Sequence, residues 1–303
     1  FREIRKLNPN FINLCLNDNL STEITLQPLQ RFDLDAAIIF SDILMVPYGL
    51  NQKVEFKKNI GPLLGEPNLN EMLKLNEDDF TKKVNQVYEA INLVKKNKIV
   101  KNKSTIGFVG APWTLLVYMI NKQSPKLKLI DNFFKDSSLI EQTLNILEKF
   151  LKIHIKNQVQ NGADVIQIFD SWAGLLNLKN LPYYVYSPTS SLVKYVKSLN
   201  IPVICFPRGI KDYKKYCETV NPDAICIDYE TDPFEVEKKI NIPVQGGMDP
   251  KVLLSDKDTL KKETKKYLDI FKDHPYIFNL GHGVLPETNP NMMDYLVKMV
   301  KDY

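Results

Sequence analysis

The chain alternates short, nearly apolar runs with longer amphipathic segments along most of its length. Continuous apolar runs of this kind are typical of strands buried on both faces of a parallel sheet. We therefore predict seven strands, at Ala36–Phe40, Thr105–Val109, Asp164–Phe169, Val203–Phe206, Ala224–Ile227, Pro243–Gln245 and Tyr276–Leu280. Apolar residues at three- and four-residue steps predict helices at Asp78–Lys98, Ser137–Gln160, Leu181–Ser198, Lys211–Thr219, Pro233–Lys239, Asp256–Phe271 and Pro290–Val300.

Strands and helices that alternate in this way indicate an α/β protein, with either a doubly wound sheet or a barrel. No GxGxxG or GxxxxGK[ST] motif follows a predicted strand, which disfavours a doubly wound nucleotide-binding fold. No repeat, glycine-rich linker or change of composition divides the 303 residues. We expect a single (β/α)8 TIM-type barrel domain over residues 1–303. Because such a barrel has eight strands, one strand would lie ahead of residue 1.

Composition disfavours several classes of protein. Hydrophobic residues make up 44% of the chain and charged residues 25%, which is ordinary globular usage. The net charge of +4 is too small to argue for nucleic acid or a membrane surface as partner. The nearest approach to a membrane helix, Phe108–Ile120, is shorter than the roughly 18 residues required. Four cysteines without a CxxC pair predict a reduced, cytoplasmic protein. The asparagine-rich segment Asn8–Asn19 is typical of a solvated loop.

Polar and glycine residues gather where the predicted strands end. In a barrel these carboxyl ends form the rim that carries the chemistry. Asp42 follows the first strand, Ser171 the third, and His282 stands between two glycines after the last. Arg208 ends the fourth strand. We therefore expect a lined cavity at this rim.

Each of these residues also has a structural explanation. Asp42 could cap the next helix, and Tyr118, in the apolar stretch after Pro112, could belong to the core. Arg5 could lie in a solvated turn. Only four of the 40 basic residues are arginines, and the planar fork of arginine suits bidentate binding of anions. Its place at a strand end makes Arg208 the stronger candidate for meeting an anion.

The sequence predicts no metal site and no covalent nucleophile. The three histidines are scattered, and none forms HExxH or His-x-Cys. Ser171 has no GxSxG context, and the cysteines lie in or beside apolar runs. What is left is a metal-free site that could hold an anion-rich ligand with a carboxylate, an imidazole, a phenol and arginine.

Five stretches resemble the uroporphyrinogen decarboxylase family, in family order and over nearly the whole chain. They are Leu26–Leu44, Ile106–Leu115, Ile168–Gly174, Gln245–Pro250 and Phe278–Pro286, the last reading FNLGHGVLP. The resemblance implies a cofactor-free barrel, usually a homodimer whose two clefts face each other. It also implies removal of CO2 from the four acetate side chains of the tetrapyrrole uroporphyrinogen III, giving coproporphyrinogen III in haem biosynthesis.

The same resemblance implies roles for single residues. Asp42 matches the catalytic carboxylate that binds the pyrrole N–H groups. Tyr118, Ser171 and His282 match residues that contact the substrate, and Arg5 matches an arginine near its propionate and acetate groups. An Arg-Gln-Ala-Gly-Arg-Tyr segment ahead of residue 1 would carry the eighth strand and two further arginines. The proton donor stays open among one of those arginines and His282 or Tyr118 acting through water.

Two alternatives keep a barrel but change the function. Methylcobamide methyltransferases resemble this family but bind zinc, typically through His-x-Cys and a later cysteine. Here Ile204–Arg208 has no histidine before Cys205. The second alternative is a non-catalytic tetrapyrrole-binding or structural barrel, which the presence of Asp42, Tyr118 and His282 disfavours.

Overall fold

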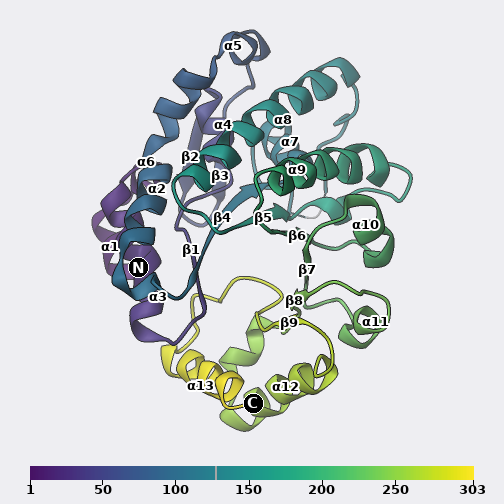
Figure 1. Cartoon of the computed structure of the whole chain (residues 1–303). Helices are drawn as coiled ribbons and strands as arrows, with labels where there is room; N and C mark the ends of the chain where they lie inside the picture. Colours follow the sequence, from purple (N-terminus) through teal and green to yellow (C-terminus); the bar gives the residue numbers. More distant parts are fainter. Residues whose placement is uncertain (127) are drawn as a thin grey trace.

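The main sheet of the protein has seven parallel strands that follow one another in chain order. The computed structural model describes residues 1–126 and 128–303. Sheet neighbours run β1-β4-β5-β6-β7-β8-β9, and every pairing is parallel. These strands are Ala36–Ile38 (β1), Ser104–Gly110 (β4), Val165–Asp170 (β5), Val203–Pro207 (β6), Ala224–Ile227 (β7), Val244–Gly246 (β8) and Tyr276–Ile277 (β9). All seven predicted strands are therefore confirmed, and Figure 1 shows the sheet curling.

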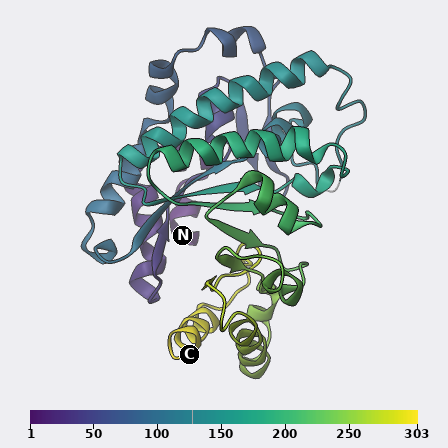
Figure 2. The same cartoon turned by 45° about the vertical axis from the view of Figure 1, so that its right-hand side comes forward.

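Helices surround the outer side of this sheet. They are Arg2–Leu7 (α1), Phe11–Cys15 (α2), Asp18–Arg31 (α3), Met45–Gly49 (α4), Leu69–Lys74 (α5), Glu77–Lys96 (α6), Pro112–Asn121 (α7), Ser137–Gln160 (α8), Ser187–Ser198 (α9), Tyr213–Val220 (α10), Pro233–Glu237 (α11), Lys257–Ile270 (α12) and Pro290–Lys301 (α13). Each predicted helix is confirmed, the third beginning with a π-helical turn at Pro182–Tyr186 before α9. The long helices α8 and α9 pack side by side over the strands (Figures 1 and 2). No helix in the described part of the chain is long and apolar enough to cross a membrane.

The curled sheet has two edges, β1 and β9. Among residues 1–126 and 128–303, neither edge pairs with a further strand. The only other sheet is a short antiparallel hairpin of Val54–Lys57 (β2) and Gly61–Leu64 (β3) in that part of the chain. The structure is thus an α/β fold built on a curled, seven-stranded parallel sheet. The eighth strand, and with it a closed barrel, stays a prediction.

The expectation of a solvated loop at Asn8–Asn19 is wrong. This segment contains α2 and the start of α3, and Ile12 and Cys15 are buried. Asn10 and Asn17 accept hydrogen bonds from backbone N–H groups in the first turns of these two helices, at 3.1 and 3.0 Å. Asparagine is favoured at helix N-caps because its side chain satisfies an N–H that has no partner in the helix. The asparagines therefore mark helix starts.

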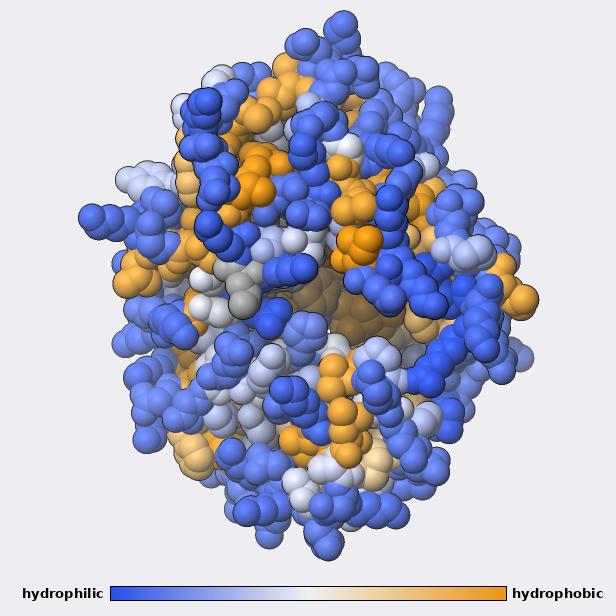
Figure 3. Space-filling view, turned by 180° about the vertical axis from the view of Figure 1, so that it is seen from behind, coloured by the Kyte–Doolittle hydropathy of each residue, from blue (hydrophilic) through white to orange (hydrophobic). Residues whose placement is uncertain are grey.

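The concave side of the sheet is only partly filled. Side chains alternate between the two faces of a strand, and on β1 Ala37 is buried while Ile38 is 43% exposed. Phe206 belongs to a small cluster separate from the main core, with Phe169 packed against it. The Phe169 ring also meets that of Phe108, at a centroid distance of 5.6 Å. Figure 3 shows a hollow near the middle of the molecule with apolar residues in its depth.

β1 leaves the sheet before its neighbour β4 ends. Its last backbone bond to β4 comes from the N–H of Ile39, at 3.1 Å. The next N–H, of Phe40, donates instead to the hydroxyl of Thr25 at 2.8 Å. On β4, the Gln158 side chain bonds both the N–H and the C=O of Phe108, at 2.9 and 3.0 Å. Side chains thus replace the missing strand pairing where the chain turns away.

Candidate functional site

Asp42 lies in the turn between β1 and α4. Its Oδ1 accepts a hydrogen bond from the backbone N–H of Leu44 at 2.8 Å. Its Oδ2 accepts none from the described residues. Burial raises the pKa of Asp42 to about 6, against the opposing effect of the Leu44 N–H. One carboxylate oxygen therefore stabilises the turn ahead of α4, although Asp42 does not cap that helix, whose N-cap is Leu44. The other oxygen is left for a ligand. The group is ionised at neutral pH.

Tyr118, on α7, lies half-buried near Asp42. Its ring contacts Trp172 edge-on, with a centroid distance of 5.9 Å. Burial raises the pKa of Tyr118, and the negative charge of Asp42 adds to this, while Trp172 and Ser124 oppose it. The phenol is therefore protonated at neutral pH and can donate a hydrogen bond.

Arg5, on α1, lies in the same region but is already engaged. Its Nη1 donates to the backbone carbonyls of Asn8 and Pro9, at 2.7 and 2.6 Å. Burial raises the pKa of Cys15, and the charges of Asp42 and Arg5 act on it in opposite directions, so both charges lie near this thiol. Part of the Arg5 guanidinium thus holds the end of α1 instead of being open to a ligand.

Ser171 directly follows β5. Its half-buried hydroxyl makes no hydrogen bond to any residue that the structure describes. The flanking backbone is held by its neighbour, because the N–H of Trp172 donates to the Thr114 hydroxyl at 3.1 Å. The Ser171 hydroxyl is therefore available to a ligand on a fixed backbone.

Asp170 also bonds Thr114, and it was not among the site residues predicted from the sequence. The Thr114 hydroxyl donates to Asp170 Oδ1 at 2.6 Å. Asp170 is buried, and its Oδ2 has no hydrogen-bond partner among the described residues. Burial raises the pKa of Asp170 to about 7, against the opposing Thr114 bond. The available signal was an acidic residue inside a buried strand, next to Ser171.

His282 lies in the loop after β9 and is exposed. Its Nδ1 accepts the N–H of Gly283 at 2.7 Å, which leaves the ring proton on Nε2. Desolvation lowers the pKa of His282, the positive charge of Arg208 lowers it further, and Asp228 opposes both. The imidazole is therefore neutral at pH 7 and can donate a hydrogen bond from Nε2. Its ring lies 6.5 Å from that of Tyr229.

The structure brings the predicted residues together as two groups. Asp42 and Tyr118 form the first, which Trp172 joins to the Ser171 loop. His282 and Arg208 form the second. A backbone bond from the N–H of Arg208 to the C=O of Asp170, at 3.1 Å, connects the second group to the Ser171 loop. Within the described residues, no hydrogen bond or ring contact joins Asp42 to His282.

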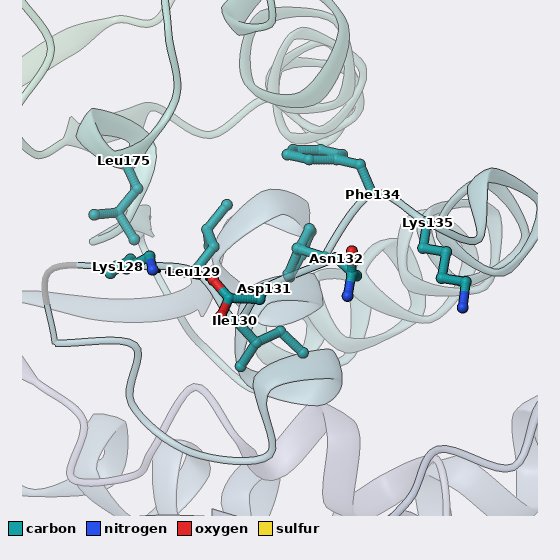
Figure 4. Close-up of a pocket in the computed structure, with 9 residues that line it drawn as sticks. Lys128, Leu129, Ile130, Asp131, Asn132, Phe134, Lys135 and Leu175 are labelled. Carbon is teal, nitrogen blue, oxygen red and sulfur yellow. Dashed lines mark hydrogen bonds and ion pairs between the residues drawn. The ribbon is translucent and has the colours of Figure 1, made fainter.

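Two cavities lie at the surface of the protein, and Arg5 borders the second through its contacts with Pro9 and Phe11. One of about 620 Å3 is lined by residues 128–135 and Leu175, and Figure 4 shows apolar and charged side chains mixed in its wall. A second, of about 640 Å3, is lined by residues 9–13, 48, 51–57 and 83. Neither wall includes a residue predicted for the site. The candidate site is therefore the set of strand ends.

The cysteine at the position that the zinc-methyltransferase alternative uses, Cys205, is fully buried on β6. Burial raises the pKa of its thiol to about 12. In the described part of the chain, no three His, Cys, Asp or Glu residues are grouped so as to hold a metal ion.

Comparisons with known proteins point to one family. The family model for "Uroporphyrinogen decarboxylase (URO-D)" matches residues 1–303. Curated relatives with the name uroporphyrinogen decarboxylase come from Rickettsia bellii (40% identical, 100% of this chain and 91% of the relative) and Orientia tsutsugamushi strain Ikeda (42%, 100% and 90%). A solved methyltransferase from Methanosarcina mazei has a similar fold, with TM-score 0.79 at 18% identity over 99% of this chain and 90% of that one. The chain belongs to the uroporphyrinogen decarboxylase family.

Proposed function

We propose that this protein removes CO2 from the four acetate side chains of uroporphyrinogen III and releases coproporphyrinogen III, in porphyrin biosynthesis. Family membership over the whole chain supports this activity. The structural observation that supports it most is Asp42, whose carboxylate is ionised at neutral pH and whose Oδ2 has no partner among the described residues.

Decarboxylation requires a group that accepts the electron pair of the broken C–C bond. When the C–C bond to a carboxyl group breaks, CO2 leaves and its bonding pair stays on the acetate methylene. A pyrrole protonated at carbon is cationic and accepts that pair. A second proton then completes the methyl group, and the first proton leaves the ring carbon to restore the aromatic pyrrole, so that each acetate consumes one proton in all. A carboxylate beside the pyrrole N–H groups stabilises the cationic ring, and partial exclusion of water strengthens the effect. We assign this catalytic role to Asp42.

The remaining residues act on the substrate's polar groups. We assign hydrogen-bond donation to the Tyr118 phenol, the Ser171 hydroxyl and His282 Nε2–H. Arg5 has donors beyond Nη1 that could reach a carboxylate at this end of the site. The lowered pKa of His282 makes its imidazole a poor proton source at neutral pH, so we propose that it is a contact and not the acid.

The wider assembly follows the family resemblance. We propose a closed eight-stranded barrel without cofactor or metal, acting in the cytoplasm as a homodimer. The chain-order strand arrangement supports such a barrel, as do β1 and β9, the two edges that pair with no further strand in residues 1–126 and 128–303. Sedimentation of the purified protein tests the dimer, since a dimer has twice the 35.0 kDa of this chain.

An anaerobic assay with uroporphyrinogen III tests the activity. Chromatography of the products, with and without a chelator, should show coproporphyrinogen III at the same rate in both. A protein that binds the tetrapyrrole without forming product would be the non-catalytic barrel. Loss of activity on chelation, restored by zinc, would overturn the metal-free mechanism.

A further inference from the structure

Arg208 presents a guanidinium without a partner at the end of β6. Its side chain is half-buried, and across residues 1–126 and 128–303 it makes no hydrogen bond and no ion pair. A guanidinium offers five N–H donors in a planar fork that matches a carboxylate. A partly desolvated fork with no protein acceptor is suited to binding an anion from solution.

The backbone at Arg208 is held from three sides. Its N–H donates to the C=O of Asp170 at 3.1 Å, and its C=O accepts the N–H of Gly174 at 3.0 Å. The next N–H, of Gly209, donates to Asp228 Oδ2 at 2.7 Å. A Cβ on Gly174 would come within 2.8 Å of the Gly209 backbone, so the two loops touch directly. The root of the Arg208 side chain is thus fixed before any ligand arrives, which lowers the cost of binding.

A neighbouring carboxylate, Asp228, already accepts three hydrogen bonds from other groups. Its Oδ2 accepts the Gly209 bond, and its Oδ1 accepts the Thr231 hydroxyl at 2.7 Å and the N–H of Glu230 at 3.1 Å. Asp228 is also buried. Its hydrogen bonds therefore organise the two loops, and it leaves the Arg208 fork unpaired.

Arg208 lies between two candidate substrate contacts. Its backbone is bonded to Asp170, the residue before Ser171. On its other side the next residue, Gly209, bonds Asp228, and the ring of the following Tyr229 lies 6.5 Å from that of His282. The charge of Arg208 acts on His282, whose Nε2–H is a further donor. A carboxylate bound by the fork would therefore lie beside a neutral imidazole that can also donate to it.

We propose that Arg208 binds a side-chain carboxylate of the tetrapyrrole in a bidentate ion pair next to His282. This inference rests on the proposed function, because it takes the tetrapyrrole as the ligand. The substrate carries both acetate and propionate groups, and either could supply the carboxylate.

The test compares Arg208→Gln and Arg208→Lys with the matched control Arg31→Gln. Arg31 is exposed at the end of α3 and lies over the Phe32 ring, away from the strand ends. For Arg208→Gln we expect KM for uroporphyrinogen III to rise about 10- to 100-fold, as loss of charge-assisted hydrogen bonds predicts. Arg208→Lys should raise KM less than Arg208→Gln does, because lysine keeps the positive charge but lacks the planar guanidinium for bidentate binding. Arg31→Gln should match the unaltered protein.

Equilibrium binding of coproporphyrinogen III separates the two carboxylates, because this product has propionates and no acetates. Weaker binding by Arg208→Gln, by the factor seen in KM, assigns the ion pair to a propionate. Unchanged binding of the product with a raised KM for the substrate assigns it to an acetate. Circular dichroism melting curves should be the same for all three variants.

The inference and the proposed function can fail separately. If the unaltered protein binds porphyrinogens but forms no product, the decarboxylase proposal fails, and weaker binding of uroporphyrinogen III by Arg208→Gln still upholds the ion pair. If Arg208→Gln binds and turns over like the Arg31→Gln control, the ion pair is overturned. A protein that binds neither porphyrinogen overturns both.

Discussion

Two carboxyl groups near the strand ends illustrate how burial sets a residue's role. Burial raises the pKa of Asp42 to about 6 and that of Asp170 to about 7. Asp42 is therefore ionised at neutral pH and suited to stabilise a cation. Asp170, fully enclosed and bonded to Thr114, is about half protonated at neutral pH and suited to hold the Ser171 loop.

Asp42→Asn should separate the effect of the carboxylate charge on catalysis from the role of the side chain in the turn. An asparagine Oδ1 can still accept the Leu44 N–H, so the turn and the melting temperature should be kept. We expect kcat to fall about 100- to 1000-fold, the range for loss of one electrostatic contact to a transition state. In the unaltered protein, kcat/KM should fall as the pH drops through about 6, since protonation removes the charge. Steady-state rates from pH 5 to 8 measure both effects.

The exposed Asp258→Asn, on α12, is the control for this substitution. It should leave the rate and its pH dependence unchanged. A rate for Asp42→Asn within threefold of the unaltered protein would remove Asp42 from the mechanism.

Asp170→Asn should change how stability depends on pH. The carboxyl pKa is 3.8 when unfolded and about 7 when folded, so the folded state holds a proton that the unfolded state has lost between these values. The free energy of unfolding therefore falls as pH rises from 4 to 7, by about 2 kcal/mol between pH 5 and 7. This contribution should be absent in Asp170→Asn. Urea unfolding at several pH values measures it, and equal slopes in the two proteins would contradict the assignment.

At the scale of elements, the sequence predicts a strand or helix well where its apolar pattern alone determines which of the two forms. Apolar runs predicted every strand of the main sheet, and helical spacing predicted α8 with both its ends correct. The short helices α1, α2, α4 and α5 and the β2–β3 hairpin were missed, because caps and tertiary packing stabilise such pieces more than periodicity does. The 14-residue α3, which has Pro28 inside it, was missed as well. Asp42, Ser171 and His282 could be named from strand ends, whereas Tyr118 and Arg5 could be named only from the family resemblance. The bonds between Thr114, Asp170 and Trp172 could not be predicted, since they depend on how α7 packs against the end of β5.

The departure of β1 from the sheet depends on one side chain of α8. Gln158 is buried and satisfies both backbone groups of Phe108 that β1 no longer reaches. Gln158→Leu should leave both groups buried without partners, each costing about 1 to 3 kcal/mol. We expect a total loss of about 2 to 6 kcal/mol in urea unfolding. The exposed Gln160→Leu, two residues along the same helix, should change stability little. Equal effects of the two variants would show that Gln158 does not replace the strand pairing.

At the scale of the whole molecule, α13 lies across from the edge strand β1. Lys301 forms ion pairs with Asp35 and Asp33 in the segment just before β1, and Lys103 reaches Asp33 from the other side at 3.1 Å. The helix also packs against α12 (Figure 1), and Leu296 is its buried residue. Charge pairing and apolar packing are therefore the two interactions that can hold α13 near the edge strand β1.

The contributions of these ion pairs and of the apolar packing to stability can be predicted from the exposure of the side chains involved. The carboxylate of Asp35 is 85% exposed and Lys301 37% exposed, and ion pairs this open contribute little because water and salt screen them. A double-mutant cycle with Lys301→Ala and Asp35→Ala should therefore show no measurable coupling in urea unfolding. Leu296→Ala, by contrast, should lower the free energy of unfolding by about 2 to 4 kcal/mol, since it removes buried apolar atoms and leaves a cavity. A strong coupling that disappears in 1 M salt, together with a small effect of Leu296→Ala, would mean that charge pairing and not packing holds α13 beside β1.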